Sequence, residues 1–251
     1  MKPLYALPLL AACAVPAWAA DVPAVLQWSQ RVALSTPVSG VVRSVQANVG
    51  ERVKRGQVLA ALDAATYQAG VAESQADVAR VKAEEQDAKR NLDRVQELYK
   101  RTVISTSELE TAQTRYARAK ARLGEVQARL ARAQKILGDS TLRAPFDALI
   151  LVRQVEPGQA VASQFQPQTL FVVARAGEML ARAKVSLAQI EKLKVGDAAT
   201  VEVNRQSYSG KIQTLGLEPV GEKGDMGYPV DVLFAVKDVL RAGTPATVKL
   251  P

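Results

Sequence analysis

The 251-residue chain contains no histidine, and its single cysteine is Cys13. The absence of histidine excludes Ser-His and Cys-His nucleophile pairs and every histidine-containing metal site. Cys13 lies so close to the N-terminus that no disulfide-built fold is expected. Carboxylate pairs remain possible in principle, but no recognisable carboxylate, phosphate-binding or dinucleotide-binding motif is present. The sequence therefore predicts a protein that is not an enzyme and that binds no cofactor or resident metal.

Methionine is also scarce, because only Met179 and Met226 lie beyond the first twenty residues. Two thioethers are too few for the soft-ligand sites that copper and silver prefer. This scarcity argues against a protein that itself binds Cu or Ag.

Proline is absent from residues 38–144 and glycine from residues 71–123. In a helix interior these residues cost about 3 and 1 kcal/mol respectively, so a long stretch without them favours helix. Within it, two arms, residues 65–101 and 106–137, carry apolar residues at alternating steps of three and four. The expected seam of the first arm comprises Val71, Ser74, Val78, Val81, Glu85, Ala88, Leu92, Val95 and Tyr99. That of the second comprises Leu109, Ala112, Tyr116, Ala119, Leu123, Val126, Leu130, Ala133 and Leu137.

This repeat, sustained over about four heptads, is typical of a coiled coil. Ser74 and Glu85 are its two polar exceptions. The arms join near residues 102–106, and so short a connection forces antiparallel neighbours. We therefore predict a helical hairpin over residues 65–140, with arms that reach about 45–55 Å.

The segments on either side of the predicted hairpin repeat one motif. A shift of 108 positions places Pro37 on Pro145, Val41 on Leu149, Val42 on Ile150, Gly50 on Gly158 and Val53 on Val161. Self-similarity at a fixed offset indicates two equivalent structural units, and each unit reads as a pair of short strands closed by a Gly turn. Residues 36–64 and 141–174 are therefore expected to form one β-domain in two halves.

Beyond Arg175 the helical pattern gives way to short alternating runs separated by Gly-containing turns. A helical turn is expected at residues 187–193. The expected strands are residues 180–185, 199–203, 210–215, 230–236 and 246–250. We predict a small, mostly antiparallel β-barrel over residues 175–251.

Residues 1–20 resemble a secretory signal peptide, with an apolar run over residues 4–14 followed by Ala17-Trp18-Ala19. Cleavage is expected after Ala19 or Ala20. A rival interpretation takes residues 10–13, Leu-Ala-Ala-Cys, as a lipoprotein box that would place a lipid anchor on Cys13.

The net charge of +8 could suggest nucleic acid as a partner. The basic residues, however, are spread along the predicted hairpin and alternate with acidic ones. The first arm has seven Lys or Arg and seven Asp or Glu, and the second has seven against three. A solvated helix surface explains this pattern, so no nucleic acid is expected. An anionic membrane surface or an acidic protein partner stays open.

This arrangement resembles the periplasmic adaptor proteins, or membrane fusion proteins, of the HlyD-like type. The resemblance is carried by Pro37-Val-Ser-Gly-Val-Val, by residues 50–59, by Arg143-Ala-Pro-Phe-Asp and by residues 240–248. It implies an elongated modular fold of mixed α and β structure. In that fold a split lipoyl-like domain (a barrel-sandwich hybrid) is interrupted by an antiparallel coiled-coil hairpin and followed by the barrel. The family's membrane-proximal domain is expected to be nearly absent, because only about fifteen residues separate the leader from Thr36.

The resemblance further implies a tripartite efflux or secretion system of the RND type. The adaptor would lie in the periplasm, associated with the inner membrane. It would link an inner-membrane transporter to a TolC-type outer-membrane channel and assemble as a homo-oligomer of six copies.

In this family the channel-binding tips resemble Arg-x3-Leu-x6-Ser, and Arg94, Leu98 and Ser105 match that spacing. Each residue also has a simpler interpretation. Arg94 could be a solvated helix charge, and Ser105 could only be an N-cap, because Ser105-Thr-Ser-Glu108 is a capping box. If Val95 and Tyr99 lie on the seam, Leu98 lies beside it, exposed, with Arg94 on the same outward face.

Two other classes of protein compete with the adaptor. A biotinyl or lipoyl carrier would need a modifiable lysine on the turn between the two β-halves, and here the hairpin replaces that turn. A free-standing structural coiled-coil protein would explain the hairpin but neither the duplicated motif nor the barrel. Intact-mass measurement of a lipoyl or biotinyl adduct would favour the carrier.

Overall fold

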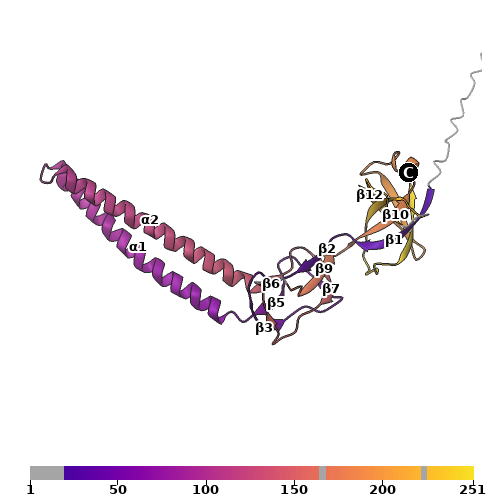
Figure 1. Cartoon of the computed structure of the whole chain (residues 1–251), viewed down its shortest axis with the longest axis horizontal. Helices are drawn as coiled ribbons and strands as arrows, with labels where there is room; N and C mark the ends of the chain where they lie inside the picture. Colours follow the sequence, from indigo (N-terminus) through magenta and orange to yellow (C-terminus); the bar gives the residue numbers. More distant parts are fainter. Residues whose placement is uncertain (1–19, 164–167, 222–224) are drawn as a thin grey trace, which may run out of the picture. The chain divides into compact units, whose positions relative to one another are not determined.

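The computed structural model describes residues 20–163, 168–221 and 225–251. Except for Ala20, the predicted leader, including Cys13, lies outside these residues. The chain divides into two compact units. One consists of residues 31–174, and the other brings together the two ends of the chain (Figure 1). In the part of the chain that is described, no helix combines the length and the apolar character needed to cross a membrane.

The first unit contains two four-stranded sheets, each built from both halves of the duplicated motif. One sheet has the order β2-β9-β7-β4 and the other β6-β5-β3-β8. The first half supplies β3 (Gly40–Val45), β4 (Arg52–Val53) and β5 (Val58–Leu62), and β2 (Arg31–Leu34) precedes it in the chain. The second half supplies β6 (Thr141–Arg143), β7 (Ala148–Arg153), β8 (Ala160–Val161) and β9 (Phe171–Arg175).

The two halves pair reciprocally, as equivalent units would. Strand β3 pairs with β8, and β4 pairs with β7. The Gly50 amide donates to the Ile150 carbonyl, and the Gly158 amide donates to the Val42 carbonyl, both at 2.8 Å. Both glycines have a left-handed backbone, with φ of 84° and 87°. Only glycine adopts this conformation readily, so the matching turn positions found in the sequence are structurally equivalent.

Two of the three matched apolar pairs lie in the core of this β-domain, whereas in the third Val41 is exposed and Leu149 is buried. Val42 and Ile150 are 1% exposed, and Val53 and Val161 are 2% and 4% exposed. They are enclosed by Leu59, Leu62, Ala148, Val155, Leu170, Phe171 and Val173. The split lipoyl-like domain predicted from the repeat is confirmed.

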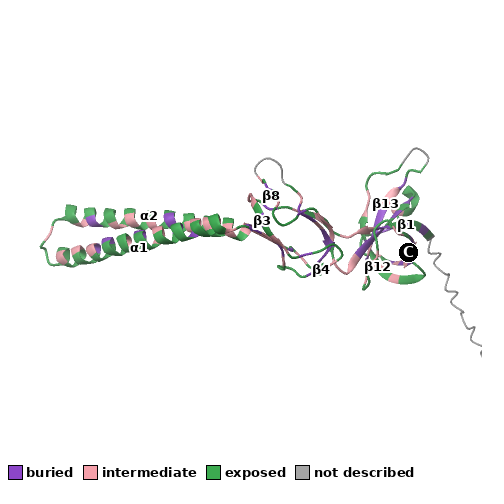
Figure 2. Ribbon diagram, turned by 90° about the horizontal axis from the view of Figure 1, so that it is seen from below, coloured by how far each residue is buried: buried purple, intermediate pink, exposed green. Residues whose placement is uncertain are grey.

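The excursion between the halves is an antiparallel hairpin of α1 (Ala65–Lys100) and α2 (Thr106–Asp139). Between residues 109 and 137, all nine predicted seam positions of α2 are buried or half-buried, and every other residue is exposed. On α1 the buried positions are Val71, Ser74, Val81, Ala88 and Leu92 (Figure 2). The polar exception Ser74 is satisfied because its hydroxyl donates to the Gly70 carbonyl at 2.9 Å. The predicted coiled-coil hairpin is thus confirmed.

Side chains at the base of the hairpin tie it to the β-domain. The Thr36 hydroxyl donates to the carbonyl of Asp139 at the end of α2, at 3.1 Å. The Tyr67 hydroxyl, in the first turn of α1, donates to the Ser39 carbonyl. The Ser39 and Ser163 hydroxyls are 3.0 Å apart. Because both helices are held at their bases, the position of the hairpin tip follows from the β-domain.

The second unit is a closed six-stranded barrel with the order β1-β10-β13-β12-β11-β14. The strands are β1 (Ala20–Trp28), β10 (Glu178–Val185), β11 (Ala198–Val203), β12 (Gln206–Leu215), β13 (Tyr228–Ala235) and β14 (Pro245–Leu250). A short helix, α3 (Leu187–Ile190), follows β10. Five strands lie where the sequence placed them.

The sixth strand, β1, is missing from the predicted barrel range of residues 175–251. It alternates as a barrel strand should, with Val22, Ala24 and Leu26 buried and the residues between them exposed. It pairs with β14 on one side and β10 on the other, which closes the barrel. The residues before Thr36 that the sequence left unassigned therefore supply β1, which belongs to the barrel, and β2.

Candidate docking site at the hairpin tip

A five-residue loop, residues 101–105, joins the two helices at the tip. The backbone amides of Arg101 and Val103 donate to the Leu98 carbonyl at 3.2 and 3.1 Å, and the Thr102 amide donates to the Tyr99 carbonyl at 2.9 Å. Thr102 has a φ of 62°. A left-handed residue after the last turn lets the next amides satisfy the free carbonyls of a helix. The loop is therefore a hydrogen-bonded closure of α1.

Ser105 begins α2 as its N-cap, as the simpler interpretation of this residue predicted. Its hydroxyl accepts from the Glu108 amide at 3.3 Å, and the Glu108 carboxylate accepts from the Ser105 amide at 3.0 Å. Such a capping box satisfies two helix-end amides reciprocally. Ser105 is exposed as well, so capping leaves its outer surface available for contact.

Arg94 is exposed one turn before Leu98, and its guanidinium donates to the Asn91 side-chain oxygen at 2.6 Å. This bond holds the cation beside α1. Arg94, Leu98 and Ser105 therefore all lie in the last turns around the loop, as the spacing implied.

The predicted register is wrong in the last turn of α1. Tyr99 was expected on the seam and Leu98 outside it, but Tyr99 is 40% exposed and Leu98 is half-buried. The less exposed positions are Leu92, Val95 and Leu98, two steps of three residues in place of the predicted three and four. Two consecutive steps of three break a heptad repeat, so the seam shifts by one residue in the last turn of α1.

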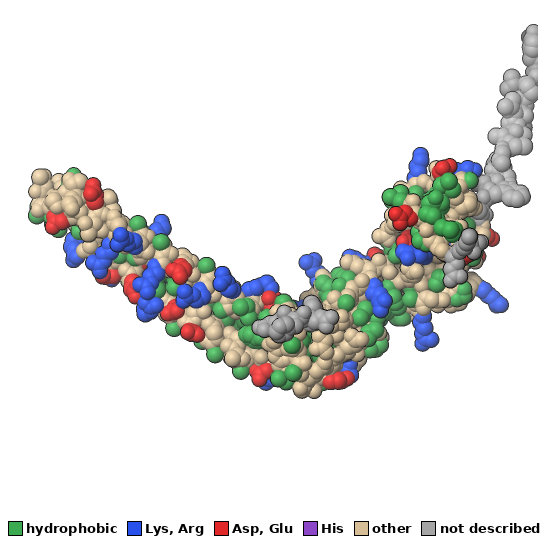
Figure 3. Space-filling model, viewed as in Figure 1, with side chains coloured by type: hydrophobic (Ala, Val, Ile, Leu, Met, Phe, Trp, Pro, Cys, Tyr) green, Lys and Arg blue, Asp and Glu red, His purple; other side chains and the backbone are tan. Residues whose placement is uncertain are grey.

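The end of the hairpin exposes two apolar side chains among polar and charged ones, such as Arg101 of the loop. Val103 is 65% exposed and Tyr99 is 40% exposed. On the face drawn in Figure 3 the end of the hairpin shows few charges, and Lys and Arg side chains gather along the shaft behind it. The sequence analysis missed Val103, although a β-branched residue in a predicted loop tip was a usable signal.

No metal centre accompanies this site. Across residues 20–163, 168–221 and 225–251, no three His, Cys, Asp or Glu side chains come together as metal ligands. The surface of the tip consists of exposed apolar and polar side chains, a capped helix start and cations behind them.

This architecture defines a class of proteins in which a split lipoyl-like domain carries a helical hairpin. The sequence profile of the CzcB-like, barrel-sandwich hybrid domain matches residues 30–175, more than half of the chain. The chain belongs to this family, and the predicted membership of the membrane fusion proteins is confirmed.

Relatives of this chain are named as resistance and export proteins. It is 27% identical over 171 residues to the cobalt-zinc-cadmium resistance protein CzcB of Cupriavidus metallidurans, covering 65% of this chain and 31% of CzcB. It is 29% identical over 188 residues to the macrolide export protein MacA of Yersinia pestis, covering 69% of this chain and 51% of MacA. The chain thus spans about a third to a half of the length of these relatives.

Solved structures support the same fold. The membrane fusion protein Spr0693 of Streptococcus pneumoniae aligns with a TM-score of 0.70 at 14% identity, over 92% of this chain and 98% of that one. A MacA-MexA chimera with the hairpin of Pseudomonas aeruginosa MexA aligns with a TM-score of 0.67 at 23% identity, over 92% and 80%.

Proposed function

We propose that the protein is a non-catalytic periplasmic adaptor of a tripartite efflux or secretion system. This proposal rests mainly on one observation, the structure of the hairpin tip. A two-helix arm, tied at its base to the β-domain, ends in a loop that exposes Val103, with Tyr99 exposed beside it and Arg94 on α1 behind it. An isolated exposed apolar side chain means little, but Val103 and Tyr99 lie together at the end of a long arm. That position suits contact with another protein.

The proposed partners are an RND-type transporter in the inner membrane and a TolC-type channel in the outer membrane. The tip, with Arg94, Leu98 and Ser105, docks on the channel, and six copies form a ring. The family membership and the names of the relatives support an efflux role. The protein lies in the periplasm, associated with the inner membrane.

The carrier alternative is not favoured. In that class the modified lysine lies on a turn between the two β-halves. Here β5 leads into α1 at Ala65, and α2 leads into β6 at Thr141, so the whole hairpin occupies the place of that turn.

Charge reversal at the tip tests the proposed docking. Arg94→Glu should abolish most transport in the producing cell, because it places a repulsive charge in the contact, while the hairpin stays folded since the side chain is exposed. Lys82→Glu makes the same change on an exposed position of α1 farther from the tip and serves as the matched control. Substrate accumulation and circular dichroism measure the two effects. Equal transport in both variants would contradict the assignment of Arg94.

A second measurement identifies the partner. A photo-crosslinking amino acid at Val103, the most exposed apolar residue of the tip, should capture an outer-membrane channel in intact cells. Mass spectrometry of the crosslinked peptide reports the contact. Capture of inner-membrane proteins alone would refute the proposed orientation of the hairpin.

A further inference from the structure

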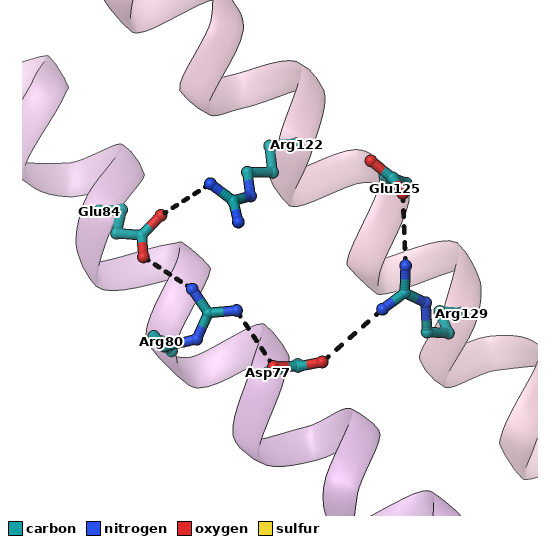
Figure 4. A network of polar contacts seen from close by, with 6 residues as sticks. All are labelled: Asp77, Arg80, Glu84, Arg122, Glu125 and Arg129. Atoms are coloured by element: carbon teal, nitrogen blue, oxygen red, sulfur yellow. Dashed lines mark hydrogen bonds and ion pairs between the residues drawn. The ribbon is translucent and has the colours of Figure 1, made fainter.

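The two helices of the hairpin are joined by a ladder of ion pairs with a seven-residue spacing. Asp77 on α1 faces Arg129 on α2 at 3.7 Å, and Glu84 faces Arg122 at 3.8 Å. Arg80 lies between the two carboxylates and bonds to both, at 3.1 and 2.8 Å. The pKa of Arg80 is raised, first by its hydrogen bond to Asp77 and then by that to Glu84. Figure 4 shows this ladder spanning the two helices.

The next step of the ladder, towards the tip, lacks its acid. Seven residues beyond Glu84 lies Asn91, and seven residues before Arg122 lies Arg115. Asn91 and Arg115 line the same groove between the helices. Asn91 carries no charge, and its side-chain oxygen already accepts from Arg94. In the described part of the chain, no carboxylate pairs with Arg115.

The groove at this step is lined by apolar side chains, by hydroxyl-bearing ones and by two charged ones, Arg115 and Glu108. Val95, Ile104 and Ala112 are buried or half-buried, and Ser107 and Thr111 stand above them. Thr111 and Arg115 also line an adjoining hollow on the outer side of α2, with Arg118. The side chains of Ser107 and Thr111 are short, so they leave room for a partner to approach the groove closely.

Arg115 lines the groove, Arg118 lines the adjoining hollow, and Arg94 bonds to Asn91 at the groove; among the described residues none of the three forms an ion pair with a carboxylate. Glu108 is engaged with Ser105 in the capping box. Glu110 lines the outer hollow, but among the described residues it forms no ion pair with either arginine. Arginines that have no acidic partner within the hairpin favour the binding of a negatively charged partner.

We infer that the missing acid is supplied in trans: a carboxylate on a helical segment of the outer-membrane channel enters the groove at Asn91 and pairs with Arg115. Arg94 and Arg118 flank the incoming carboxylate, and the hydroxyls of Ser107 and Thr111 serve as further hydrogen-bonding groups. This inference rests on the proposed function and extends the docking site from the loop to the face of α2.

Photo-crosslinking from Thr111 in intact cells tests the occupant. We expect a crosslink to a channel peptide that carries Asp or Glu. A crosslink only to a second copy of this chain, to a channel peptide without carboxylates, or to nothing would overturn the inference. If Val103 still captures the channel in those cases, the proposed function stands and only the groove assignment fails. If neither position captures the channel, both fail.

A pair of substitutions then separates docking from folding. Asn91→Asp supplies the acid within the hairpin, so it should occupy Arg115, keep or raise hairpin stability, and weaken binding to the purified, crosslink-identified channel by about tenfold. Arg115→Gln should weaken binding to a similar extent. Arg122→Gln, at the previous step of the ladder, is the control and should leave binding unchanged. Unchanged binding in Asn91→Asp and Arg115→Gln would overturn the inference, as would an equal loss in all three variants.

Discussion

At the scale of single residues, two glycines illustrate opposite demands on the backbone. Gly124 lies in the interior of α2, and an added Cβ would meet nothing within 4 Å. At Gly210, in β12, an added Cβ would lie 2.8 Å from the Leu233 carbonyl oxygen and from Val232. The first glycine only weakens its helix, whereas the second permits the close approach of β12 and β13.

The same substitution should therefore have opposite effects at these two positions. Gly124→Ala should raise the stability of the hairpin by about 0.5–1 kcal/mol, because alanine is the better helix former. Gly210→Ala should lower the stability of the barrel by about 1–3 kcal/mol, because the added methyl group overpacks the contact between β12 and β13. Urea unfolding followed by circular dichroism at 222 nm reports the hairpin. The fluorescence of Trp28, which packs against the barrel core, reports the barrel. A loss of stability in both variants would show that Gly124 has a role beyond its helix.

At the scale of elements, the seam and the ion-pair ladder contribute unequally to hairpin stability. The ladder residues are exposed, and exposed ion pairs are worth about 0–1 kcal/mol each. Seam residues such as Leu123 remove apolar surface from water, at about 1.5–3 kcal/mol for a fully buried side chain. The seam therefore holds the helices together, and the ladder mainly favours one register.

Substitutions on neighbouring positions of α2 check this ranking. Leu123→Asp should destabilise the hairpin by about 2–4 kcal/mol, because a charge replaces apolar contact on the seam. Arg122→Gln, one residue away, should cost under about 1 kcal/mol, and that cost should shrink at high salt. Urea midpoints at low and high ionic strength measure both. A larger loss in Arg122→Gln would reverse the ranking.

At the scale of the whole molecule, both units are assembled from segments distant in the chain. The β-domain closes across the hairpin, and the barrel closes when β1 pairs with β14, with Ala20 opposite Leu250. A cut after Ala19 would leave β1 complete. A cut after Ala20 would remove only its first residue. The predicted leader thus ends where the barrel begins.

We predict that the mature protein starts at Ala20 or Asp21. Intact-mass measurement of the protein purified from the periplasm should give this N-terminus, and a diacylglyceryl-modified Cys13 would refute it. Urea unfolding followed by circular dichroism near 215 nm, a probe that does not depend on Trp28, should show a cooperative barrel transition for a chain starting at Ala20. A chain starting at Gln30 should lose it, because β10 and β14 would both be left with an open edge.

Much of the structure at the candidate docking site followed from sequence, because its parts are local. Ser105 was recognised as a cap from the residues that follow it, and Arg94 was placed by its spacing from Leu98. The half-burial of Leu98 was not predicted, because the three-four repeat was extended to Tyr99, whereas the last turn of α1 breaks that repeat. The unpaired Arg115 was also out of reach, because only the register of α1 against α2 places it beside Asn91.

The sequence alone determined the features that repeat at fixed spacing: the two β-halves offset by 108 residues, the seam of the hairpin and the alternation of five barrel strands. Such periodicities follow from the geometry of a single strand or helix, so they can be read without knowing the fold. Only the tertiary structure decided which strands pair, as in β3 with β8 and β1 with β14. Strand pairing joins residues distant in the chain, and nothing in either local segment specifies its partner.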